Sequence, residues 1–94
     1  MRTIEYSSQF KRDYRKAKRN PKFRKLEGWL KPVIADLAAD VSLSDPPYRD
    51  HKLSGVWVGY QELHIRPDLL LIYSKPDDET IRLVRIGSHS ELFG

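Results

Sequence analysis

The stretch from Tyr48 to Tyr73, YRDHKLSGVWVGYQELHIRPDLLLIY, decides the fold of this 94-residue chain. Residues 60–65 alternate between polar and apolar side chains, as expected of a strand with one buried face. The Arg-Pro-Asp sequence at 66–68 is typical of a turn, and residues 69–73 are almost all apolar, as in a central strand. The stretch therefore predicts two consecutive antiparallel strands at the centre of a sheet.

Periodicity extends this prediction to the flanking residues. Pro32 interrupts one of two amphipathic segments, and because an interior proline removes a helical hydrogen bond, we expect a kink or short break there. Residues 40–59 show little periodicity and are predicted to form a long loop. The sequence predicts an α+β fold of order β-α-α-β-β-β, with one mainly antiparallel sheet and two helices on one face. The expected strands are residues 2–6, 60–65, 69–73 and 80–87, and the expected helices are residues 8–19 and 20–39.

Length and composition set the class of protein. Residues 1–94 are enough for one domain with a modest core. The chain contains no cysteine, which excludes disulfides, thiolate metal ligands and a cysteine nucleophile. No stretch approaches the ~20 apolar residues of a membrane helix, and the N-terminus does not read as a signal peptide. We therefore expect a cytoplasmic protein with no membrane partner.

Positive charge is concentrated in the first third of the chain. Residues 1–31 contain eleven lysines and arginines against three acidic residues, whereas residues 32–94 contain six against ten. Binding to a polyanion is favoured by such one-sided basicity, because each neutralised phosphate releases counterions. The simpler alternative is a solvated helix surface that binds nothing.

Candidate catalytic groups lie in the second half, where all three histidines are found: His51, His64 and His89. Imidazole can both accept and release a proton near neutral pH. Asp68 follows the predicted strand of His64, where a carboxylate can hold an imidazole in one tautomer and increase its basicity. Two imidazoles on opposite sides of a phosphodiester are what RNA cleavage requires, since one removes the 2′-hydroxyl proton while the other protonates the leaving 5′-oxygen.

Other readings of the same residues remain open. His51, His64, Asp68 and His89 could together ligate zinc, but their spacing matches no compact metal signature, so we expect no metal and no cofactor. A non-catalytic RNA- or ribosome-binding module would use the basic helices and treat the histidines as structural. Phe93, four residues after His89, is a candidate for stacking on an RNA base.

The string from Tyr48 to Tyr73 and the closing RIGSHSELFG resemble the YafQ branch of the RelE superfamily, the toxins of bacterial type II toxin–antitoxin pairs. The resemblance implies a RelE-like sandwich and a ribosome-dependent mRNA interferase, an endoribonuclease that needs no cofactor. The family's catalytic positions fall on four residues, with its substrate-stacking aromatic on Phe93. These four residues are His51, His64, Asp68 and His89. The resemblance implies that His89 is the proton donor to the leaving oxygen, while His51, His64 and Asp68 supply or orient the base.

The resemblance also implies partners. These are mRNA in the ribosomal A site, 16S rRNA and a cognate antitoxin protein that silences the toxin. One departure concerns the residue after the turn aspartate, because relatives can carry Trp there and this chain has Leu69. Any contact that such a ring makes with RNA is therefore missing here.

Overall fold

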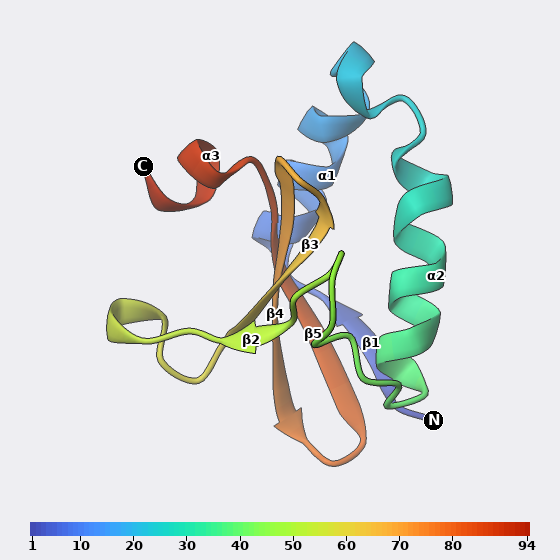
Figure 1. Cartoon of the computed structure of the whole chain (residues 1–94), viewed down its shortest axis with the longest axis vertical. Helices are drawn as coiled ribbons and strands as arrows, with labels where there is room; N and C mark the ends of the chain where they lie inside the picture. The colour runs from blue at the N-terminus through green and yellow to red at the C-terminus, as the bar shows by residue number, and fades with distance from the viewer.

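The computed structural model describes all residues, 1–94, and its centre is a five-stranded sheet, whose arrangement Figure 1 shows. The strand order is β1-β5-β4-β3-β2, in which β1 runs parallel to β5 and every other pair is antiparallel. The predicted mainly antiparallel α+β fold is therefore confirmed. The strands are β1 (Thr3–Tyr6), β2 (His51–Lys52), β3 (Gln61–Arg66), β4 (Leu69–Asp77) and β5 (Thr80–Gly87), and the α-helices are α1 (Ser8–Lys18), α2 (Leu26–Ala38) and α3 (His89–Phe93).

The sheet is held together by β4, whose first five residues are all buried. Their side chains alternate between two apolar clusters, one on each face of the sheet. Leu71 and Tyr73 belong to the larger cluster, whereas Leu70 and Ile72 belong to a smaller one. The run of apolar residues at 69–73 is continuous because both faces of the central strand are covered.

Two helices cover the face with the larger cluster, as predicted (Figure 1). Ser7 caps α1, since its side chain accepts a hydrogen bond from the amide of Phe10, and Phe10 and Ala17 then bury the apolar side of that helix. Leu30, Val33 and Leu37 do the same for α2. No helix is long and apolar enough to span a membrane.

Of the kink or short break predicted at Pro32, the break does not occur, because α2 continues through this residue from Leu26 to Ala38. The interruption occurs earlier. Asn20 caps a short 3₁₀ helix, η1 (Pro21–Phe23), and the α-helix restarts only at Leu26. Buried side chains on both sides of Pro32 anchor the helix to the sheet, and tertiary packing of this kind outweighs the local cost of the proline.

Three elements lie outside the predicted order. Within the expected loop, His51–Lys52 pairs with β3 as β2, and a second 3₁₀ helix, η2 (Gly55–Trp57), follows it. The chain ends in the short helix α3, which lies on the opposite side of the sheet from α1 and α2 (Figure 1). Leu92 of α3 packs on Leu70 and Ile72, so the second face of the sheet is only partly covered.

Candidate active site

Two of the predicted histidines meet on the second face of the sheet, on either side of Glu62. His51 in β2 is the cross-strand partner of Glu62 in β3, and His64 lies two residues further along β3 on the same face. The Nε2 atom of His64 is 3.7 Å from one carboxylate oxygen of Glu62, and that of His51 is 3.9 Å from the other. The fold therefore brings together two imidazoles that are thirteen positions apart in the sequence.

A partly buried network fixes the segment that carries His51. The hydroxyl of Tyr73, which is fully buried, donates a hydrogen bond to the carboxylate of Asp50, and the side-chain amide of Gln61 donates to both. Burial, together with the adjacent Asp50 carboxylate, raises the pKa of Tyr73 far above its ordinary value, so the phenol stays a donor. The Nδ1 atom of His51 lies 2.7 Å from the backbone oxygen of Arg49, which fixes the ring as well.

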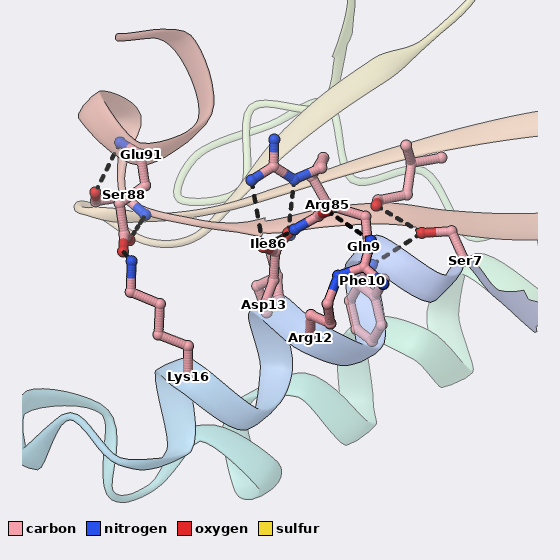
Figure 2. Close-up of polar contacts among 11 residues, drawn as sticks. Ser7, Gln9, Phe10, Arg12, Asp13, Lys16, Arg85, Ile86, Ser88 and Glu91 are labelled. Atoms are coloured by element: carbon pink, nitrogen blue, oxygen red, sulfur yellow. Dashed lines mark hydrogen bonds and ion pairs between the residues drawn. The ribbon is translucent and has the colours of Figure 1, made fainter.

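The third histidine is the first residue of α3. Ser88 and Glu91 form a capping box, in which each side chain accepts a hydrogen bond from the backbone of the other. The carboxylate of Glu91 also pairs with the Lys16 ammonium at 2.9 Å, and the hydrogen bond from Ser88, followed by the lysine, lowers the pKa of Glu91 to about 2. The contact between Lys16 and Glu91 ties α3 to α1 (Figure 2). The exposed His89 is thereby held at the start of the helix.

Packing of Leu92 places α3 on β4, the strand next to that of His64. Leu92 packs in one cluster with Leu70. Leu70 is the cross-strand partner of His64, and the backbones of neighbouring strands are roughly 5 Å apart. Phe93 is half-buried, its ring centre 5.1 Å from that of His89 and 6.0 Å from that of Trp57. The histidine and the aromatic ring proposed for RNA binding therefore neighbour each other on the face that carries His51 and His64.

The strand that leads into α3 is fixed by a nearly buried ion pair. Asp13 of α1 accepts hydrogen bonds from the Arg85 guanidinium at 2.7 and 3.2 Å, from the amide of Ile86 and from the side chain of Gln9 (Figure 2). Only a tenth of the Asp13 side chain and a quarter of the Arg85 side chain are exposed. The carboxylate raises the pKa of Arg85 further above its ordinary value, so the pair is charged.

Replacing Asp13 with Asn should lower the free energy of unfolding by about 2 kcal/mol, because Arg85 would keep its charge without a partner. This is less than the roughly 3–5 kcal/mol of a fully buried pair, since Arg85 retains contact with water. Urea unfolding of the purified protein measures the loss. The matched control is Asp78→Asn in the exposed turn after β4, and equal unfolding midpoints for the two variants would refute the role of the ion pair.

Asp68 pairs with a lysine rather than with a histidine. It stands in the turn between β3 and β4, and its carboxylate forms an ion pair with the Lys22 ammonium at 2.9 Å. No hydrogen bond or ion pair joins Asp68 to His64, so the expectation that this carboxylate holds the His64 ring is not met by the contacts present. Sequence reasoning missed Glu62, although the alternation of β3 already puts it on the same face as His64.

Two further properties limit the chemistry of this region. No three His, Cys, Asp or Glu side chains lie in an arrangement that can hold a metal ion. Beside His64 there is a pocket of about 520 Å³, whose wall includes Tyr48 and the cations Arg49 and Arg66. A cleft of this size with cationic walls suits a phosphate-bearing ligand.

Residues 2–94 match the family described as the bacterial toxin of type II toxin–antitoxin systems, YafQ. The chain belongs to the YafQ family. Among its curated relatives, the mRNA interferase toxin YafQ of Escherichia coli K12 is 40% identical over 95 residues, which cover 99% of this chain and 97% of that protein. The predicted family is thus confirmed.

Solved structures of YafQ-family and similar toxins share the fold. The E. coli DinJ–YafQ complex contains a chain that is 37% identical, with a TM-score of 0.83 and full coverage of both chains. A metal-bound toxin from Helicobacter pylori is 41% identical, with a TM-score of 0.80 over 99% of this chain and all of that one. Both confirm the predicted RelE-like architecture of this YafQ-family chain.

Proposed function

We propose that this YafQ-family toxin is a ribosome-dependent mRNA interferase that cleaves by metal-independent acid–base catalysis. The observation that carries the proposal is the placement of His51 and His64 on the partly covered face of the sheet, on which the helix that begins with His89 also packs. Attack of a 2′-hydroxyl on the adjacent phosphorus needs a base at the hydroxyl and an acid at the leaving 5′-oxygen, and imidazoles can serve as both. The 40%-identical relative is named an mRNA interferase, which supports the same reaction class.

The base belongs to the pair His51 and His64. A base must lie within hydrogen-bond reach of the 2′-hydroxyl, and both rings border the partly covered face where a strand of RNA can lie. Asp68 completes the predicted catalytic set. Because its carboxylate pairs with Lys22, its contribution comes through the charge and shape of the turn rather than through contact with an imidazole.

On the leaving-group side, His89 gives a proton to the 5′-oxygen. Its ring is exposed and lies beside that of Phe93, so it can reach a bound phosphate. Phe93 keeps part of its ring exposed and stacks on a base next to the cleaved bond. Stacking of this kind positions the RNA strand without requiring a particular base sequence.

The proposed partners follow from charge. A groove of about 380 Å³ between α1 and α2 has an apolar floor with Phe10 and Leu30 and a rim of Lys11, Arg15 and Lys31. An acidic amphipathic segment of a cognate antitoxin fits this chemistry, and the DinJ–YafQ complex gives a precedent for such a pair. In the free toxin, the basic helices contact 16S rRNA in the cytoplasm, where mRNA occupies the ribosomal A site.

Cleavage mapping on translated mRNA tests the proposal against a non-catalytic binding module. Purified toxin is added to ribosomes stalled on a defined message, and new 5′ ends are found by primer extension. We expect discrete ends within the A-site codon, and none when the same mRNA is free. A module that only binds would stop translation and leave the message intact.

Metal independence is a separate prediction, because a toxin of similar structure from H. pylori binds a metal. Toxin stripped with EDTA and returned to the Mg²⁺ buffer that ribosomes need should cleave as fast as untreated toxin, since imidazoles supply both proton transfers. Single-turnover cleavage measures this rate. Loss of cleavage after stripping, with recovery on adding Zn²⁺ or Cu²⁺, would instead establish a metal enzyme.

A further inference from the structure

Glu62 is the only charged or polar residue among the buried residues of the chain. Its side chain is 9% exposed, yet its carboxylate accepts no hydrogen bond. Removing a carboxylate from water is costly unless other groups compensate its charge. The Nε2 atoms of His51 and His64 are the only ion-pair partners within 4 Å, so the two histidines are the protein groups placed to compensate the charge that water contacts only in part.

The neighbours of Glu62 within the sheet do not explain its charge. Its cross-strand partner on β4 is Ile72, which is fully buried and apolar, and on β2 it is His51. A leucine or valine would suit such a place in a structural sheet better than a glutamate. The carboxylate is thus expected to serve the imidazoles rather than the stability of the fold.

The two rings offer different nitrogens. The Nδ1 atom of His51 faces the backbone oxygen of Arg49 at 2.7 Å, and because a carbonyl can only accept, Nδ1 carries the proton and Nε2 is left to act as base. His64 has no hydrogen-bond partner at Nδ1, while its Nε2 faces Glu62. With the proton of His64 on Nε2, its Nδ1 becomes the free base.

We propose that Glu62 is a positioning residue shared by His51 and His64, which holds His64 in the Nε2–H tautomer and stabilises the positive charge when either ring takes up the 2′-hydroxyl proton. The inference rests on the proposed nuclease function and adds one residue to the site. Glu62 belongs to none of the sequence motifs, and it takes the place beside the imidazoles that was expected of Asp68. The 3.7 and 3.9 Å separations are longer than hydrogen bonds, and such contacts in a free enzyme tighten when substrate binds.

The proton balance is complete with these groups. One imidazole removes the 2′-hydroxyl proton as the bond from the 2′-oxygen to phosphorus forms. The bond from phosphorus to the 5′-oxygen then breaks, and His89 gives its proton to that oxygen. Glu62 exchanges no proton in this scheme and acts only through its contact with the imidazolium.

Three variants test the proposal in single-turnover cleavage of ribosome-bound mRNA. In Glu62→Gln, which keeps the shape and removes the charge, the maximal rate should fall roughly 10- to 100-fold, less than the full 10²–10⁴ of acid–base catalysis because both rings remain. The toxin concentration at half-maximal rate should not change. Glu62→Asp keeps the charge and should retain most of the rate, and the exposed Glu79→Gln is the matched control with wild-type behaviour.

A measurement on the wild-type protein keeps the test independent of how the variants fold. The ¹⁵N chemical shifts of the imidazoles at high pH should show the proton on Nδ1 of His51 and on Nε2 of His64. The proposal is overturned by a proton on Nδ1 of His64, or by a folded Glu62→Gln variant with the wild-type maximal rate. Failure of the nuclease function itself looks different, because wild-type toxin would then leave the message uncut.

Discussion

The His89→Ala variant should lose cleavage of ribosome-bound mRNA by roughly 10²- to 10⁴-fold, the contribution expected of a general acid. Without the imidazole, the 5′-oxygen must leave as an alkoxide or take its proton from water. The fold should be unaffected, because His89 is exposed and occupies the first position of α3, and no hydrogen bond or ion pair of its side chain holds the helix. Single-turnover rates of purified wild-type and variant toxin measure the effect.

Binding and stability serve as controls for this variant. Its melting temperature and its affinity for ribosomes should match those of wild type, because Lys16, Ser88 and Glu91 still fix α3. A wild-type cleavage rate in His89→Ala would remove His89 from the reaction. Equal growth inhibition by the two proteins in cells would lead to the same conclusion.

A message with 2′-deoxyribose at the nucleotide before the cleaved bond should not be cut at all. In the proposed reaction the 2′-hydroxyl is the nucleophile, so replacing it with hydrogen removes the attacking atom. The substituted message still binds the ribosome and presents the same bases to Phe93. Primer extension of the two messages, each loaded on stalled ribosomes, gives the comparison.

The control for the deoxy substitution is the same change one nucleotide upstream, which should leave the rate unaltered. This arrangement separates the chemistry from any loss of mRNA binding. Full cleavage of the message that is deoxy at the reacting nucleotide would exclude attack by the 2′-oxygen and would require water as the nucleophile.

Local periodicity was enough to predict most of the fold. The alternation at residues 60–65 and the apolar run after it became β3 and β4. Helix α3 was missed because five residues show no helical period, although Ser88 and Glu91 have the spacing of a capping box. The two-residue strand β2 has no local signal, since only its register with β3 defines it.

The site was harder to predict because its contacts join distant parts of the chain. Identifying the histidines required only their chemistry, but the meeting of His51 and His64 depends on the pairing of β2 with β3. Asp68 was expected beside His64 from its nearness in sequence, whereas the ion pair with Lys22 comes from η1 folding over the turn. Glu62 gave no motif, because its burial depends on how both neighbouring strands pack.

The chemical ends of the RNA products test the central claim most directly. Attack by the 2′-hydroxyl, with protonation of the 5′-oxygen by His89, must leave a 2′,3′-cyclic phosphate on one fragment and a 5′-hydroxyl on the other. Mass spectrometry of the two fragments from a short ribosome-bound message distinguishes these ends. We expect the cyclic phosphate and the 5′-hydroxyl. A 3′-hydroxyl on the upstream fragment and a 5′-phosphate on the downstream fragment would contradict the account.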